Sequence, residues 1–252
     1  MKLLTPFILT ASSLSALATP NNLPDEDRYG PGEQQRIEIE DEGVSNIKFG
    51  FEGLTSYRSE YIHRGFKLAK ESLEFQLGAQ VALSDTSFLD LGLWYGTEMG
   101  DGDFSETGAF IDFTKNIGDI NYTIGVKAQD YSNSIFESGV EFSFGIDWRI
   151  NDNWNLKGII LYDTGANGWY RNTKISYYKN IDDKSYFTFD LGVSAVSNYY
   201  GRDGFNDVNA KFSYTYNISD AVSVTPYLGA SMGIDRDAED HLFGGIYFAV
   251  SF

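Results

Sequence analysis

The 252-residue chain has no cysteine, two histidines and five prolines. The lack of cysteine excludes thiolate metal sites, cysteine nucleophiles and thiol switches. His63 and His241 stand far apart, so the usual supply of general bases and imidazole metal ligands is nearly exhausted. We therefore expect no catalytic residues, no bound metal and no cofactor.

Basic side chains are also scarce: 19 Lys and Arg stand against 36 Asp and Glu, which gives a formal net charge of −17. Such a chain repels a phosphate backbone at long range. Nucleic acid is not an expected partner.

Long apolar runs are missing after the N-terminal segment, and a membrane-spanning helix needs about 20 such residues. The first 18 residues follow the secretory pattern, with Met1-Lys2, an apolar stretch from Leu3 to Leu14, and the small-x-small site Ala16-Leu17-Ala18. We interpret residues 1–18 as a cleaved signal peptide. A permanent helical anchor is the alternative, and the polar residues and prolines within and just after the stretch disfavour it.

Residues 19–45 contain eight acidic side chains, two arginines and three prolines, with almost no aromatic residues. This composition buries too little apolar surface to order itself. We expect an acidic flexible tail in the periplasm. Docking of its acidic run 38–42 on a partner or in a pore mouth is the alternative.

From residue 46 to residue 252 the hydrophobic pattern has a period of two, which is typical of β-strands with two different faces. Twelve segments show it: 47–57, 73–83, 89–96, 107–113, 120–128, 140–150, 154–162, 173–177, 187–193, 208–216, 222–232 and 242–252. Most approach the roughly 9–11 residues with which a tilted strand crosses a bilayer. The pattern predicts an all-β fold, a transmembrane antiparallel up-and-down β-barrel of twelve strands with both termini periplasmic. Weak alternation in 170–179 leaves a ten-stranded barrel open.

The connections alternate in character. Short Asn/Asp/Ser/Gly turns lie at 83–86, 116–119, 150–153, 180–183 and 217–220, and mostly longer, charged loops at 63–72, 97–104, 129–135, 163–168, 197–206 and 234–241. Short turns on one side and longer loops on the other are typical of outer-membrane barrels. This pattern places both histidines in loops.

A soluble β-sandwich would also alternate, but its polar face would carry few glycines because glycine weakens strands. Here the polar face includes Gly78, Gly92, Gly108, Gly145 and Gly229, which suits a tightly curved wall. Pro226 falls on the apolar face of the segment 222–232, five residues past the turn at Ala221, where it removes a donor from the ladder, so we expect a β-bulge near the periplasmic rim.

The polar face gives the expected lumen of the barrel. Its predicted pore-lining residues are Lys48, Glu52, Arg58, Glu74, Asp90, Trp94, Glu106, Phe110, Asp112, Lys127, Glu137, Glu141, Asp147, Arg149, Lys157, Asp163, Lys174, Asp190, Lys211, Tyr227 and Tyr247. Charges of both signs would pair in part and would orient small polar solutes. The acidic excess favours cations mildly, and twelve strands indicate a narrow pore.

Two resemblances to known proteins support this interpretation. The end of the chain, with Tyr247, Phe248, Val250 and Phe252, resembles the signal read by the outer-membrane assembly machinery. Residues 54–66, LTSYRSEYIHRGF, are similar to the opening of the TorF-like porins, which has a Thr-Ser-x-Tyr run and an aromatic-x-x-Arg-Gly run. That resemblance implies an outer-membrane channel of unassigned substrate.

The sequence therefore favours a porin-like channel in the bacterial outer membrane, with lipid, lipopolysaccharide, the assembly machinery and small polar solutes as partners. A non-conducting structural or adhesive barrel is the main alternative. An outer-membrane phospholipase lacks a suitable Ser-His pair. Calcium could bind the acidic loops at 101–103 and 235–240, although these lack the pattern of an EF-hand loop.

Overall fold

The computed structural model describes residues 48–234 and 239–252, and these ranges contain strands and no helix. The strands are β1 (Lys48–Arg58), β2 (Tyr61–His63), β3 (Phe66–Ala69), β4 (Ser72–Ser84), β5 (Ser87–Glu98), β6 (Ser105–Ile117), β7 (Ile120–Ser132), β8 (Gly139–Asn151), β9 (Trp154–Asp163), β10 (Gly168–Asp182), β11 (Ser185–Tyr199), β12 (Arg202–Ser219), β13 (Val222–Gly233) and β14 (His241–Ser251). No helix in the described ranges is long and apolar enough to cross a membrane. The interpreted signal peptide and acidic tail lie outside the described residues.

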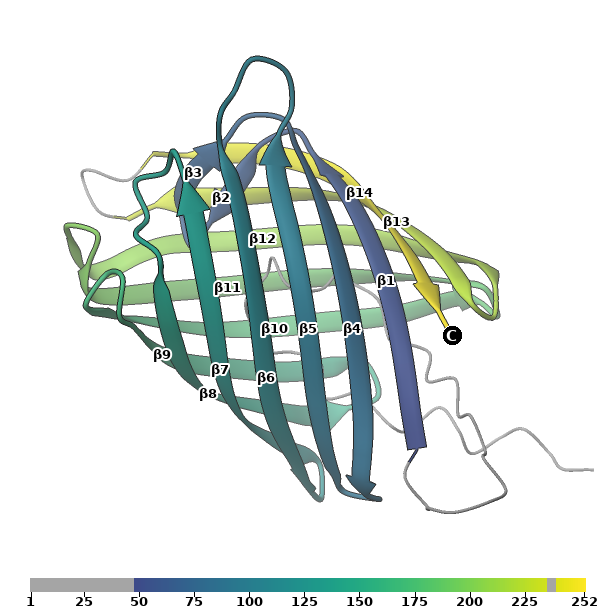
Figure 1. Cartoon of the computed structure of the whole chain (residues 1–252). Coiled ribbons are helices and arrows are strands. Elements are labelled where there is room, and N and C mark those ends of the chain that lie inside the picture. Colours follow the sequence, from purple (N-terminus) through teal and green to yellow (C-terminus); the bar gives the residue numbers. More distant parts are fainter. Residues whose placement is uncertain (1–47, 235–238) are drawn as a thin grey trace, which may run out of the picture.

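Twelve of these strands form one closed antiparallel barrel (Figure 1). Each strand pairs with its neighbour in the sequence, and β1 closes the ring by pairing with both β4 and β14, for example Glu52 with Gly78 and with Ser251. The prediction of twelve strands is confirmed, and the ten-stranded alternative is wrong. The segment with weak alternation belongs to β10, whose in-register ladder with β9 extends from Gly168 to Tyr177.

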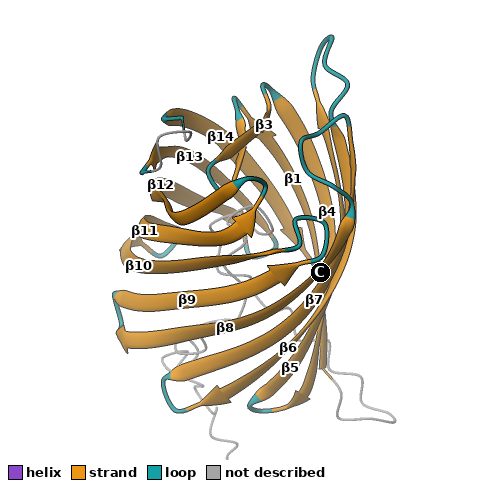
Figure 2. Cartoon of the chain, turned by 90° about the vertical axis from the view of Figure 1, so that its left-hand side faces the viewer, coloured by secondary structure: helices purple, strands orange, loops and turns teal. Residues whose placement is uncertain are grey.

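The two ends of the barrel differ. At one end, here called the turn end, two-residue turns join the strands, such as Gly118-Asp119 between β6 and β7. At the other, the loop end, the connections are mostly longer, and the one between β1 and β4 holds the small sheet β2–β3 (Figure 2). Residues 63–72, expected as a plain loop, therefore contain part of a hairpin, and β11 and β12 extend across most of the expected loop 197–206.

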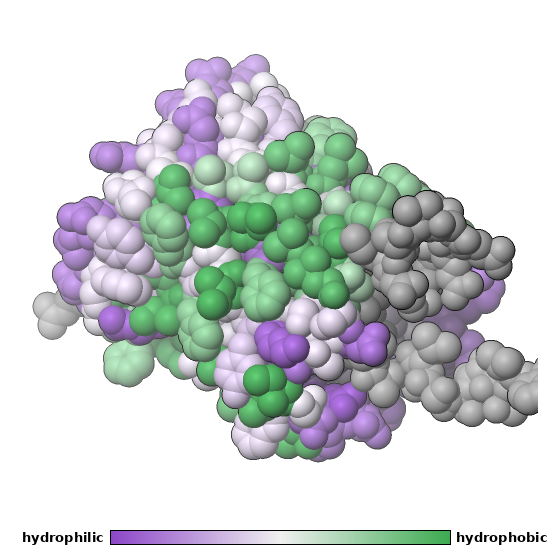
Figure 3. Space-filling view, turned by 60° about the horizontal axis from the view of Figure 1, so that its bottom comes forward, coloured by the Kyte–Doolittle hydropathy of each residue, from purple (hydrophilic) through white to green (hydrophobic). Residues whose placement is uncertain are grey.

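Alternate side chains on each strand point away from the interior of the barrel. Most of these outward side chains are apolar, so the outer face is apolar. Leu77, Ile124 and Leu228 are 63%, 61% and 64% exposed, while their strand neighbours Gln76, Thr123 and Tyr227 are buried. Figure 3 shows hydrophobic side chains gathered across the middle of one face, with hydrophilic residues above and below. An apolar band of this kind is typical of barrels that stand in lipid.

The strand β13 passes through Pro226 without a bulge. Pro226 pairs with Ile246 of β14, and on the β12 side the register is the same before and after it, with Ser213 opposite Tyr227 and Tyr216 opposite Val224. The register shift lies at Asn217/Ser219 beside the turn instead. An irregularity therefore does lie near the rim at this turn, as expected, but it does not lie at Pro226.

Glycines on the inner face make room for large rings. A Cβ on Gly108 would lie 2.0 Å from the indole of Trp94, which lies flat against the wall beside Phe110, with ring centroids 6.5 Å apart. Trp94 and Phe110 thus fill space in the interior. These glycines therefore have two roles, since they suit a curved wall and also leave room for the rings that lie over them.

Candidate functional site: a hairpin docked inside the lumen

The hairpin β2–β3 lies inside the barrel at the loop end (Figures 1 and 2). All six residues from Tyr61 to Phe66 are buried, so this segment has no solvent-facing side. The two ends of the hairpin segment, here called its roots, are held at the rim of the barrel. There the amide of Ser59 donates to the carbonyl of Gly244 (2.8 Å), and the amide of Met99 donates to the carbonyl of Glu71 (2.7 Å). The hairpin therefore leaves the wall at β1, enters the lumen and returns at β4.

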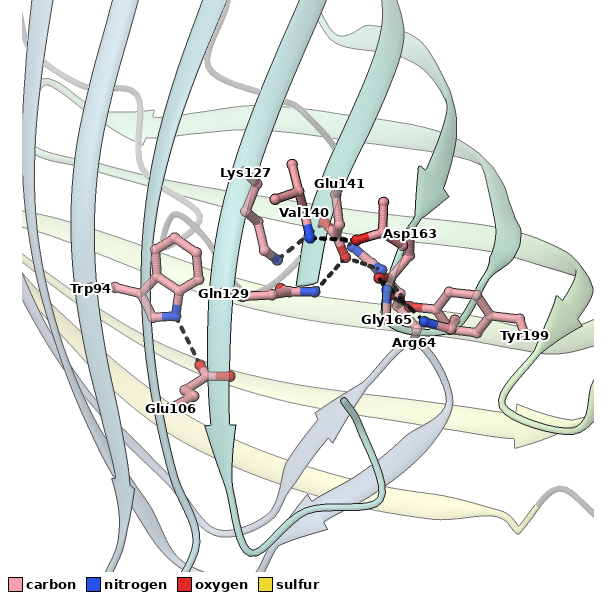
Figure 4. A network of polar contacts seen from close by, with 12 residues as sticks. Arg64, Trp94, Glu106, Lys127, Gln129, Val140, Glu141, Asp163, Gly165 and Tyr199 are labelled. Atoms are coloured by element: carbon pink, nitrogen blue, oxygen red, sulfur yellow. Dashed lines mark hydrogen bonds and ion pairs between the residues drawn. The ribbon is translucent and has the colours of Figure 1, made fainter. Parts of the chain in front are cut away.

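The tip of the hairpin carries Arg64, which crosses to the opposite wall (Figure 4). Its guanidinium donates to both carboxylate oxygens of Glu141 on β8, at 2.6 and 2.9 Å, and to the hydroxyl of Tyr199 on β11 at 2.5 Å. It also lies 5.1 Å from the ring centroid of Tyr170 on β10. A planar guanidinium that donates two hydrogen bonds to one carboxylate and lies against aromatic rings is a favourable arrangement for arginine.

The carboxylate of Glu141 has further partners. Gln129 donates to it at 2.9 Å and the ammonium of Lys127 lies 3.4 Å away. A second carboxylate, Asp163, accepts a hydrogen bond from Tyr199 at 3.3 Å. Since the side chains of Arg64 and Glu141 are each only 3% exposed, this ion pair is withdrawn from bulk water and is screened little by salt.

The backbone of the tip is held as well. Asn206 on β12 donates to the carbonyl of Arg64 (2.9 Å), and Arg202 donates to that of Gly65 (3.1 Å). Gly65 has a φ of +77°, and a Cβ there would lie 2.9 Å from the amide nitrogen of Asn206. Only glycine fits this position without strain or displacement, which accounts physically for the Arg-Gly pair in the sequence.

An apolar cluster surrounds the docked tip. Phe66 packs edge-on against Phe136 at 5.3 Å, and Phe136 stacks on Tyr200 at 4.2 Å. The Tyr200 hydroxyl accepts from the amide of Glu137 at 3.2 Å, and burial raises the pKa of Tyr200, so the hydroxyl stays neutral at ordinary pH. Tyr200 thus fastens the β7–β8 loop over the hairpin.

A second polar contact fixes the first strand of the hairpin. Tyr61 donates to Glu106 on β6 at 2.8 Å, and the indole of Trp94 donates to the same oxygen at 3.1 Å. Arg58 forms an ion pair with Glu74 and lies 4.7 Å from the centroid of the Tyr61 ring. A small cavity beside Arg58, Lys211 and Tyr227 has a volume of about 10 Å³, enough for one water.

Other ion pairs in the interior run along the wall. Lys157 lies 3.6 Å from Asp147 and Lys174 lies 4.0 Å from Asp190, in each case between neighbouring strands. Such pairs link neighbouring strands and stiffen the wall. Arg64, by contrast, reaches from the β1–β4 connection to the far side of the ring.

Most of the predicted pore-lining residues have buried side chains on the inner face. These are Arg58, Glu74, Asp90, Trp94, Glu106, Phe110, Asp112, Lys127, Glu141, Asp147, Lys157, Asp163, Lys174, Asp190, Tyr227 and Tyr247, with Glu52 and Lys211 partly buried. Arg58, Trp94, Glu106, Lys127, Glu141 and Asp163 meet the hairpin network, and Lys211 lies beside Arg58 and Ile62. Asp90, Asp112, Asp147, Lys157 and Asp190 lie nearer the turn end of their strands.

Three predicted residues do not fit this description. Glu137 is exposed in the β7–β8 loop, because β7 continues to Ser132 and β8 begins only at Gly139. Arg149 lies at the turn-end rim, where it donates to the exposed Asp119 of the β6–β7 turn at 2.7 Å. Lys48 is the first described residue of β1, and its side chain lies outside the described part.

Sequence reasoning missed the centre of the site: Arg64, Phe66, Phe136, Tyr199 and Asn206. It also placed both histidines in loops, whereas His63 lies buried in β2 and His241 begins β14. One signal was available. Residues 159–162, Ile-Ile-Leu-Tyr, are apolar on both faces, which indicates that the inner face of β9 is covered near the loop end.

A metal centre finds no support in the described ranges, where no three His, Asp or Glu side chains come together as ligands. Asp101 and Asp103 are exposed in the β5–β6 loop. Residues 235–238 of the other acidic loop lie outside the described residues.

No family model and no curated protein matches the chain. Solved structures share the fold at low identity. A KdgM porin aligns with a TM-score of 0.53 and 8% identity over 81% of this chain and 99% of that one. An outer membrane channel from Pseudomonas putida F1 aligns with a TM-score of 0.55 and 8% identity over 86% of this chain and 100% of that one. LpxR from Salmonella typhimurium aligns with a TM-score of 0.51 and 10% identity over 80% of this chain and 99% of that one. The chain thus has the twelve-stranded barrel architecture of these proteins, which host more than one kind of function.

Proposed function

We propose that this chain is an outer-membrane channel for small polar solutes or ions, narrowed at its loop end by the hairpin 61–69. The observation that carries the proposal is the reversal of polarity across the wall: apolar side chains face outward around the closed barrel, and charged ones face inward. Lipid outside and water inside is the environment in which this distribution is stable. The likeness to a porin and to an outer membrane channel supports it.

The charge of the interior favours cations. Nine buried carboxylates (Glu74, Asp90, Glu106, Asp112, Glu141, Asp147, Asp163, Asp190 and Asp207) stand against five buried cations (Arg58, Arg64, Lys127, Lys157 and Lys174). An acidic lumen raises the local concentration of cations and lowers that of anions. We therefore propose a mild preference for cations.

The remaining details belong to the same proposal. The export signal at residues 1–18 would deliver the chain to the outer membrane of a bacterium, and the terminal strand with Phe248 and Phe252 would be read by the assembly machinery. Lipid and lipopolysaccharide would contact the apolar band. The TorF-like resemblance of residues 54–66 gains a physical meaning here, since its Arg-Gly pair is the docked tip of the hairpin.

The test is single-channel conductance and reversal potential of the mature chain in a planar bilayer. We expect small steps with a reversal potential shifted toward that of the cation. A correctly inserted barrel that never conducts would favour the alternative, a structural or adhesive barrel, because the docked hairpin would then be a permanent seal.

A further inference from the structure

The pocket that holds Arg64 has the composition of a binding site for a free organic cation. It offers a carboxylate in bidentate geometry from Glu141, a hydroxyl and ring face from Tyr199, and a ring face from Tyr170. Asp163 adds a second carboxylate behind Tyr199. These groups come from β8, β9, β10 and β11, so the barrel wall builds the pocket and the hairpin supplies only its occupant.

The charge of the pocket depends on that occupant. Without Arg64, two buried carboxylates, Glu141 and Asp163, would face the single ammonium of Lys127, which lies 3.4 Å from Glu141. Two carboxylates against one cation in a buried position attract another cation. The guanidinium fork and the two tyrosine faces then favour a planar group over a compact ammonium.

The occupant is attached to the chain in a way that permits exchange. The tip is held by side chains of β8, β11 and β12, whereas the roots at Ser59 and Glu71 are held by backbone hydrogen bonds at the rim. Release of Arg64 would remove the ion pair from the tip, which would then be held only by the hydrogen bonds from Asn206 and Arg202 and by the packing of Phe66, while the roots stay in place. A tethered ligand competes with free ligand through its effective concentration, which for short tethers is in the millimolar range.

We propose that this pocket is a guanidinium-binding site in which Arg64 acts as a tethered pseudo-ligand, and that solutes carrying a guanidinium group compete with it and undock the hairpin. This inference rests on the proposed function for its physiological use, since it names guanidinium compounds as the solute class that opens the loop end. The binding step itself does not depend on conduction.

Binding is tested by calorimetry with ethylguanidinium chloride on the folded full chain in detergent. We expect Arg64→Ala to bind saturably, and the wild type to bind about 100-fold more weakly if the tether keeps the pocket about 99% occupied. The double variant Arg64→Ala/Glu141→Gln should lose the binding, and ethylammonium should bind Arg64→Ala more weakly than ethylguanidinium. Equal titrations of the wild type and Arg64→Ala, or of the single and double variants, would overturn the proposal.

Lys67→Ala is the matched control, because Lys67 lies on the same hairpin with an exposed side chain that pairs with Glu60 outside the pocket. It removes the same charge and should titrate like the wild type. Should Arg64→Ala fail to fold, Arg64→Lys keeps the charge and removes the fork. It should bind ethylguanidinium more tightly than the wild type, and equal binding would overturn the proposal.

Planar bilayers separate this inference from the channel proposal. Ethylguanidinium should increase the conductance of the wild type more than ethylammonium does at the same concentration, and Arg64→Ala should show the larger conductance without it. Saturable binding with silent bilayers would retain the pocket and refute the channel. Conduction without binding would retain the channel and refute the pocket.

Discussion

The outward position of Leu77 gives a quantitative test of where the barrel stands. Leu77 is the sixth of the thirteen residues of β4 and is 63% exposed on the outer face. If that face meets lipid, Leu77 lies near the middle of the apolar band, where arginine costs about 2–4 kcal/mol. In a protein surrounded by water, the same exposed substitution would change stability by about 0.5 kcal/mol or less.

The chain offers a matched control for depth. Ile117 is 61% exposed but is the last residue of β6, at the turn-end rim, where arginine in lipid costs about 0–1 kcal/mol. Equilibrium unfolding of Leu77→Arg and Ile117→Arg in lipid vesicles should therefore differ by roughly 2–3 kcal/mol, a factor of about 30–150 in the folding equilibrium. Equal stabilities of the two variants would refute the depth assignment and the lipid-facing band with it.

Two further predictions concern the docked hairpin. Gly65→Ala should loosen the tip, because the added Cβ meets Asn206 and the backbone has a φ of +77°; we expect faster trypsin cleavage after Arg64 and Lys67, and a cleavage rate equal to that of the wild type would contradict this. Tyr200→Phe removes the hydrogen bond to the β7–β8 loop at a cost of about 1 kcal/mol. Because burial raises the pKa of Tyr200, its contribution is present below the pKa of about 10 of an unfolded tyrosine and falls as the pH rises above it, so the variant should lose stability less steeply in alkaline unfolding experiments.

The barrel could be predicted from the sequence because each strand lies between two different environments. A period of two records that difference directly, and it located segments such as 73–83 and 222–232 without any long-range information. Glycine on the inner face and the short polar turns added independent support. The same pattern placed most of the charged side chains correctly on the inner face.

The hairpin could not be predicted in this way, because residues 61–66 are buried on every side and show no alternation. Its position depends on contacts between residues that are distant in the chain, such as Arg64 and Tyr199, which are 135 positions apart. The both-face apolar run at 159–162 indicates that something covers β9, but it does not identify the hairpin. The prediction that Glu137 lines the pore was wrong for a local reason, because the loop before β8 is longer than the alternation suggested.

The central claim is that alternate residues of one strand face lipid and water. Ser143 and Phe144 are neighbours on β8, and Phe144 is exposed on the outer face while Ser143 is partly buried on the inner one. The chain has no native cysteine, so Ser143→Cys and Phe144→Cys each carry a single thiol. After insertion into vesicles, a fluorophore at position 144 should be quenched by a lipid-attached quencher and one at position 143 should not be. Quenching at position 143 alone, or at neither position, would contradict the account.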